Sequence, residues 1–209
     1  SLSTFFSWLE EEDYIIKSPM KRIHKVKTAV IVKDTIPDEK VEILRDNCNN
    51  LRDRALIDFL LSTGIRVGEL VRLNIDDIDF SERECVVYGK GDKERKAYFD
   101  AKTKIHLLNY YIESRTDDNS ALFVSLNKPH SRLTESGVEL RLREMGKKLG
   151  VEKVHPHKFR RTMATRAIEK GMPIEQVQKI LGHEQIDTTL RYAMVNQNNV
   201  KLSHRKFIS

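Results

Sequence analysis

The segment from Thr63 to Leu70, with the sequence TGIRVGEL, combines a helix stop, a cation and a carboxylate. Gly64 ends an apolar run, Arg66 stands at the start of the next predicted helix, and Glu69 follows three residues later. Free backbone N–H groups at a helix start favour an anion, and a carboxylate at i+3 can hold the guanidinium in one orientation. Alone, the pattern also fits a helix start with a surface ion pair.

Five further residues of suitable chemistry follow in the chain. His157 and Arg160 are three residues apart in the first turn of a predicted helix, and His183 lies just past the predicted end of another. Tyr192 comes nine residues later, and Lys90 stands between two glycines in a predicted hairpin tip. Each has an ordinary structural interpretation, but their joint occurrence in this order indicates a common site.

With these motifs, the chain resembles the catalytic domain of a tyrosine recombinase of the phage and transposon integrase type. The matching segments are TGIRVGEL at 63–70, GKG at 89–91, HKFR at 157–160, LGH at 181–183 and TTLRY at 188–192. The residue after the second arginine is often histidine in this family and is Arg161 here, outside the reacting set.

The resemblance implies a role for each residue. Tyr192 would attack a DNA phosphodiester, leaving a 3′-phosphotyrosine and a free 5′-hydroxyl. Arg66 and Arg160 would grip the two non-bridging oxygens, and Lys90 would protonate the leaving 5′-oxygen.

Three more residues complete the implied site. His157 would assist as acid or base, His183 would complete the anion cage, and Glu69 would brace the site. General chemistry supports this division, because guanidinium forks match phosphate oxygens bidentately and nearby cations favour the phenolate form of a phenol.

No metal and no cofactor are expected. Asp76, Asp77 and Asp79 lack partners at metal-site spacing, and the chain has no glycine-rich phosphate loop of the P-loop kind. A phosphotyrosine stores the bond energy, so no nucleotide is implied.

The charge distribution predicts double-stranded DNA as the partner. The chain has 209 residues, with 37 Lys+Arg against 31 Asp+Glu and a net charge of +6, and its basic residues form a track. The candidates for DNA contact are Lys21, Arg22, Lys25, Lys27, Arg141, Arg143, Lys147, Lys158 and Arg161. We expect a homotetramer on DNA, a monomer or weak oligomer without it, and accessory DNA-bending or directionality proteins.

The apolar runs are shorter than the roughly 20 residues that a membrane helix needs. Cys48 and Cys85 could pair, but two cysteines in a chain of this size indicate a reducing compartment. We therefore expect no membrane contact and a cytoplasmic, nucleoid-associated protein.

The periodicity of apolar residues predicts a mainly α fold with a small antiparallel β-sheet, an α+β arrangement like that of a tyrosine recombinase catalytic domain. We expect the last helix of a truncated N-terminal core-binding domain at 1–12, a basic linker at 13–36, and the catalytic domain with a C-terminal docking tail at 37–209. Helices are predicted at 37–46, 51–62, 101–115, 135–149, 156–170, 173–181 and 187–192, and strands at 75–80, 84–88 and 95–99. Asp187 is the predicted N-cap of the last helix.

Two other functions fit part of the pattern. A type IB topoisomerase has similar chemistry but relaxes one duplex without exchanging partners. A non-catalytic module could use the helix after Pro173 in a helix-turn-helix, although such a reader needs no buried arginine pair.

Overall fold

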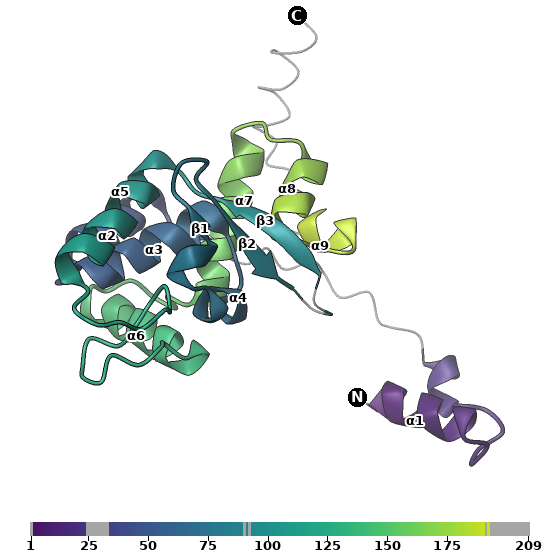
Figure 1. Ribbon diagram of the computed structural model, residues 1–209. Helices are drawn as coiled ribbons and strands as arrows, with labels where there is room; N and C mark the ends of the chain where they lie inside the picture. Colours follow the sequence, from purple (N-terminus) through teal and green to yellow (C-terminus); the bar gives the residue numbers. More distant parts are fainter. Residues whose placement is uncertain (1, 24–33, 90, 92, 191, 193–209) are drawn as a thin grey trace, which may run out of the picture. The chain divides into compact units, whose positions relative to one another are not determined.

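Figure 1 shows the computed structural model, which describes residues 2–23, 34–89, 91, 93–190 and 192. The chain divides into two units, Ser1–Ile31 and Val32–Ser209.

The first unit contains the helix α1 (Leu2–Glu11), as predicted, and a short 3-10 helix, Pro19–Arg22. The chain folds back on α1, because Lys21 pairs with Glu10 at 2.5 Å and the rings of Trp8 and Tyr14 lie 5.7 Å apart. Residues of the predicted linker therefore contact α1. The division into 1–12, 13–36 and 37–209 stays a prediction.

The second unit is organised around α3 (Leu51–Thr63), which packs against α5 and α7. The Asn50 side chain accepts the Asp53 N–H at its start, and Gly64 ends it in the left-handed conformation with φ of 60°. Phe59 is fully buried, with its ring 5.8 Å from Phe99 and 6.1 Å from Phe123. Its apolar character on most faces is that of a central helix.

The other helices surround this core. They are α2 (Asp38–Asp46), α4 (Val67–Arg72), α5 (Ala101–Asn109), α6 (Glu135–Lys148), α7 (Pro156–Glu169), α8 (Ile174–Leu181) and α9 (Ile186–Leu190). The predicted helix at 101–115 becomes a π-helix at Tyr110–Ser114. Because α9 begins at Ile186, the prediction of Asp187 as its N-cap is wrong.

A three-stranded antiparallel sheet in the order β1-β2-β3 completes the fold. Its strands are β1 (Ile78–Asp79), β2 (Glu84–Tyr88) and β3 (Glu94–Tyr98), and β3 lies beside α8 (Figure 1). The first half of the first predicted strand is a 3-10 helix, Ile75–Asp77, because the Asp77 carboxylate accepts the Asn74 N–H at 2.7 Å and starts a turn. The predicted fold class, mainly helical with one small antiparallel sheet, is confirmed.

Within the described ranges, no helix combines the length and the apolar character that a membrane span requires. Cys48 and Cys85 are free thiols. Burial raises the pKa of each to about 12.

Candidate active site

Arg66 and Glu69 make the contact that their spacing predicts. Arg66 is the N-cap of α4, and its backbone N–H donates to Glu69 Oε2 at 2.8 Å. Its Nη1 donates to Glu69 Oε1, also at 2.8 Å. The Glu69 side chain is 3% exposed and that of Arg66 is 38% exposed. A buried carboxylate thus holds a guanidinium that solvent can reach.

Arg160 lies in the first half of α7 and is 3% exposed. Its Nη1 donates to the Gly64 carbonyl at 2.6 Å, and its Nη2 donates to the Leu181 carbonyl. Burial, and then the positive charges of Arg66 and Arg95, lower the pKa of Arg160 to about 10. The guanidinium remains charged at neutral pH.

Three arginines from distant parts of the chain meet at the C-terminal end of α8. Three consecutive carbonyls there each accept from a different guanidinium: Ile180 from Arg95 at 2.8 Å, Leu181 from Arg160, and Gly182 from Arg66 at 3.3 Å. The C-terminal end of a helix carries partial negative charge, so it stabilises cations. It gathers them without neutralising them, because a carbonyl has no net charge.

His183 follows this helix end and faces the same cluster. Its Nδ1 lies 2.8 Å from the Thr189 hydroxyl. Burial, followed by the charges of Arg160, Arg66 and Arg95, lowers the pKa of His183 to about 4. The imidazole is therefore neutral at pH 7.

Tyr192 is half-buried beside His183, with ring centroids 6.0 Å apart and planes inclined at 31°. Its backbone N–H donates to the Thr189 carbonyl at 2.9 Å, and its ring packs against the small apolar cluster of α7 and α8 that includes Leu181. The structure therefore brings the predicted nucleophile next to a predicted member of the anion cage.

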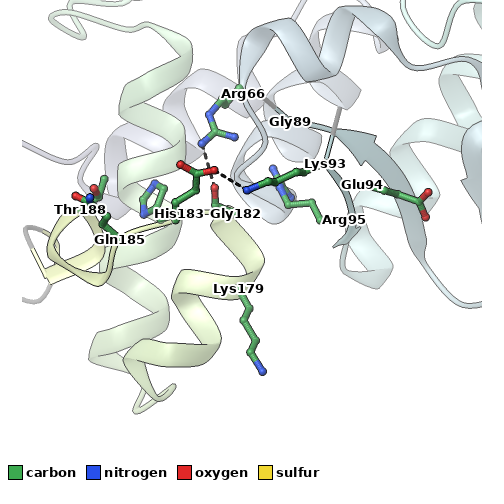
Figure 2. Close-up of a pocket in the computed structure, with 11 residues that line it drawn as sticks. Arg66, Gly89, Lys93, Glu94, Arg95, Lys179, Gly182, His183, Gln185 and Thr188 are labelled. Atoms are coloured by element: carbon green, nitrogen blue, oxygen red, sulfur yellow. Dashed lines mark hydrogen bonds and ion pairs between the residues drawn. The ribbon is translucent and has the colours of Figure 1, made fainter. Parts of the chain in front are cut away.

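Arg66, Arg95 and His183 border a hollow of about 490 Å³ (Figure 2). Lys93 and Thr188 also line it, whereas Arg160 and Tyr192 are not among its lining residues. Gly89 also lines it, while Lys90 lies outside the described residues.

His157 is exposed in the first turn of α7, with its ring 6.5 Å from that of His155. It is not among the residues that line the hollow. The role of His157 as acid or base stays a prediction.

Arg95 is the functional candidate that the sequence analysis missed. Its Nη2 donates to Glu69 Oε2 at 2.6 Å, and its side chain is 12% exposed. One signal was available, because alternation along a strand places Arg95 on the same face as the apolar Ala97. Ala97 is fully buried, so a cation two residues earlier points inward.

The predicted DNA-contact residues on the helices differ in how free they are. Lys158 is not the free surface cation that the sequence predicted, since it is buried and its ammonium donates to the Glu152 carbonyl at 3.1 Å. Arg141 binds the buried carboxylate of Asp53 through Nε at 2.7 Å and Nη2 at 2.6 Å, so it supports the fold.

Arg161 donates to the Asp34 carbonyl at 2.8 Å. Arg143, Lys147 and Arg22 are exposed. Lys21 pairs with Glu10, while Lys25 and Lys27 lie outside the described residues.

No group of three or more His, Cys, Asp and Glu side chains within the described ranges is placed to hold a metal ion. The absence of a metal and of a cofactor from the reaction stays a prediction.

Comparison with known proteins agrees with this site. Residues 35–199 match the pattern of the Phage integrase family. The chain belongs to this family. It is a tyrosine-type site-specific recombinase, an enzyme that cleaves and rejoins DNA.

Two relatives are similar to this phage integrase family member over almost all of its length. Tyrosine recombinase XerC of Oceanobacillus iheyensis is 33% identical over an alignment of 218 residues. The alignment covers 99% of this chain and 71% of the relative. Tyrosine recombinase XerC of Staphylococcus aureus is 34% identical over an alignment of 212 residues, which covers 96% of this chain and 70% of the relative.

Solved structures of recombinases share the fold of this family member. The crystal structure of XerA recombinase has a TM-score of 0.74 at 29% identity and covers 98% of this chain and 73% of that chain. The structure of XerH site-specific recombinase bound to palindromic difH substrate, in a post-cleavage complex, has a TM-score of 0.75 at 24% identity. The match covers 95% of this chain and 63% of that chain.

Proposed function

We propose that this recombinase holds one phosphodiester of duplex DNA between Arg66 and Arg160 and attacks it with Tyr192. The phenol oxygen bonds to phosphorus, the bond to the 5′-oxygen breaks, and a 3′-phosphotyrosine and a free 5′-hydroxyl result. The observation that carries this proposal is the meeting of three guanidinium groups at the end of α8, next to His183 and Tyr192.

The two arginines suit the transition state of this step. Negative charge builds on the equatorial phosphate oxygens, and planar guanidinium forks match those oxygens bidentately. Each terminal nitrogen carries two hydrogens, and the contacts of Arg66 and Arg160 to Glu69 and to backbone carbonyls use one hydrogen on each. One preorganised donor aimed at developing charge is worth roughly 2.7–4 kcal/mol.

The remaining residues transfer protons, complete the anion site or orient the arginines. Lys90 gives a proton to the leaving 5′-oxygen, and His157 assists as acid or base. His183 completes the anion cage as a neutral imidazole, since its pKa is about 4. Glu69 braces Arg66. Because the 5′-hydroxyl of another duplex can attack the same phosphotyrosine, the step is reversible and permits strand exchange.

The proposed partner is duplex DNA, contacted by exposed cations such as Arg143 and Lys147, in a homotetramer with accessory DNA-bending or directionality proteins. XerH is recorded bound to its difH substrate and the Tn1549 transposon integrase in complex with DNA, which supports a DNA partner here.

We further propose a cytoplasmic, nucleoid-associated location. The segment after Asn198, outside the described residues, is proposed to dock on a neighbouring protomer. Its deletion should weaken synapsis more than binding of a single half-site.

A suicide substrate tests the proposed chemistry. A duplex recovered from a randomised pool by binding to this chain is nicked close to the cleavage point, so that the released fragment diffuses away and the covalent adduct accumulates. We expect an adduct on a denaturing gel that Tyr192→Phe abolishes and that EDTA leaves unchanged. The matched control is Tyr98→Phe, which alters an exposed tyrosine on β3. An adduct that survives in Tyr192→Phe would contradict the proposal.

The same assay separates the alternatives. A type IB topoisomerase would form the adduct and relax a supercoiled plasmid but would not exchange strands between two duplexes. A non-catalytic DNA-binding module would form no adduct with any substrate that it binds.

A further inference from the structure

Arg95 joins two parts of the active site that hold different arginines. One terminal nitrogen, Nη2, donates to Glu69 Oε2 at 2.6 Å, and the other, Nη1, donates to the Ile180 carbonyl at 2.8 Å. Glu69 is 26 residues before Arg95 in the chain and Ile180 is 85 residues after it. A single guanidinium thus links β3 to the start of α4 and to the end of α8.

The first link fixes the carboxylate that orients Arg66. Glu69 Oε2 accepts from both the Arg66 backbone and Arg95, while Oε1 accepts from Arg66 Nη1. A buried carboxylate is costly unless it is paired and hydrogen-bonded, and Glu69 has two cations as partners. Without Arg95, one oxygen of this carboxylate would lose its charged partner and the side chain would lose a fixed rotamer.

The second link fixes the helix end that holds Arg160. Ile180 precedes Leu181 and Gly182, whose carbonyls accept from Arg160 and Arg66. Any shift of this segment relative to β3 would therefore move both phosphate-binding arginines. Arg95 resists that shift because both of its terminal nitrogens are bound, at opposite ends of a rigid planar group.

The contacts of Arg95 are with groups that orient the two phosphate-binding arginines. Its side chain is 12% exposed, and its Nε is buried with no hydrogen-bond partner among the described residues. Both terminal nitrogens already donate to protein oxygens. Because Glu69 orients Arg66 and the end of α8 accepts from Arg160, these contacts give Arg95 a route to the reaction through the residues that it holds.

We propose that Arg95 is a positioning residue for DNA strand cleavage, and that it sets Arg66 and Arg160 in register by tying Glu69 to the end of α8. This inference rests on the proposed function of Arg66 and Arg160. It assigns Arg95 no contact with DNA. It predicts that a substitution slows cleavage without weakening DNA binding to the same degree.

The test is single-turnover cleavage of the suicide substrate at saturating DNA by four proteins: wild type, Arg95→Lys, Glu69→Gln and the double variant. Lysine keeps the positive charge but cannot reach both oxygens in the same geometry. We expect Arg95→Lys to cleave about ten- to a hundredfold more slowly, the range expected when a reacting group is misplaced by about 1 Å or less. Its dissociation constant for DNA should stay within about threefold of wild type. The matched control is Lys96→Gln, which removes a cation on the outer face of the same strand.

The double variant distinguishes positioning through Glu69 from an independent effect. If Arg95 acts through Glu69, the double variant cleaves no more slowly than Glu69→Gln alone, because residues that act in one network are not additive. If the fold-reductions in cleavage rate of the two single variants multiplied in the double variant, the inference would be overturned. Cleavage by Arg95→Lys at the wild-type rate would also overturn it. If thermal melting shows that Arg95→Lys does not fold, Glu69→Asp takes its place. It retracts the carboxylate by one methylene, and wild-type cleavage by that variant would likewise overturn the inference.

The outcome for the wild-type protein keeps the two proposals apart. An adduct with the wild type together with full activity of Arg95→Lys would refute the positioning role alone. Absence of an adduct with the wild type would refute the proposed function and this inference with it.

Discussion

Gly182 lies so close to Arg95 that a Cβ on the glycine would be 2.6 Å from both the Cδ and the Nε of the arginine. The glycine also ends α8 in the left-handed conformation, with φ of 61°. Gly150 has nearly the same φ, 63°, after α6, but a Cβ there would meet nothing within 4 Å. Gly182 thus meets a conformational and a packing requirement, whereas Gly150 meets only the first.

The matched pair Gly182→Ala and Gly150→Ala should separate these two requirements. Each substitution should lower the free energy of unfolding by about 1–2 kcal/mol, because a residue with a Cβ is disfavoured in the left-handed conformation. Gly182→Ala should lower the free energy of unfolding by more than Gly150→Ala does, because its methyl group displaces Arg95. It should also slow cleavage of the suicide substrate. Urea unfolding and single-turnover cleavage measure the two effects. Equal losses of stability and equal cleavage rates in the two variants would contradict this account.

Arg66→Lys should lose most cleavage and retain DNA binding, since the charge remains but the guanidinium fork does not. Loss of one such donor typically lowers a rate constant by about 10²–10³. The measurement is adduct formation at saturating DNA, with half-site binding measured in parallel. Arg72→Lys, on an exposed residue of the same helix, is the control. A variant that cleaves like wild type would exclude bidentate clamping of the phosphate by Arg66.

The sequence predicted best the features that neighbouring residues determine. The helix around Phe59 and its stop at Gly64 follow from a continuous apolar run and one glycine, and the structure places both as predicted. The contact of Arg66 with Glu69 follows from an i, i+3 spacing. In each case the interaction partners lie within one helical turn, so local patterns carry the information.

Features that depend on distant partners were missed. Arg95 binds Glu69 and the Ile180 carbonyl, and no spacing along the chain relates these three residues. Lys158 was predicted to contact DNA, yet it is buried and its ammonium donates to the Glu152 carbonyl. The direction in which each cation points is set by tertiary packing, which residue type alone does not reveal.

Phe59→Ala should destabilise the catalytic unit strongly. The ring is fully buried and lies against the rings of Phe99 and Phe123, so truncation leaves a cavity between three segments of the chain. The expected loss is about 3–5 kcal/mol of unfolding free energy. Ile105→Ala, which truncates a side chain that is 56% exposed on α5, should change stability by no more than about 0.5 kcal/mol. Urea unfolding at pH 7 measures both, and similar losses in the two variants would contradict the burial pattern.

His183 should make the stability of the DNA-free protein depend on pH below neutrality. Its pKa is about 4 in the folded chain against the ordinary histidine value of 6.5, because burial and then Arg160, Arg66 and Arg95 disfavour the imidazolium. The unfolded chain therefore binds more protons than the folded chain between these two values. The free energy of unfolding must then fall as the pH is lowered from about 6.5 to about 4, and the contribution of His183 is constant above and below that window.

A His183→Asn variant should show a shallower decline over the same window. The slope that remains reports other groups, among them His155, whose pKa is also lowered, chiefly by burial. Urea unfolding at intervals of half a pH unit from 4 to 7 measures both slopes, and His155→Asn provides the matched comparison. If wild type and His183→Asn lost stability in parallel, the imidazole would not be held neutral by the arginine cluster. The electrostatic description of the site, in which three guanidinium groups act on His183 before DNA arrives, would then be wrong.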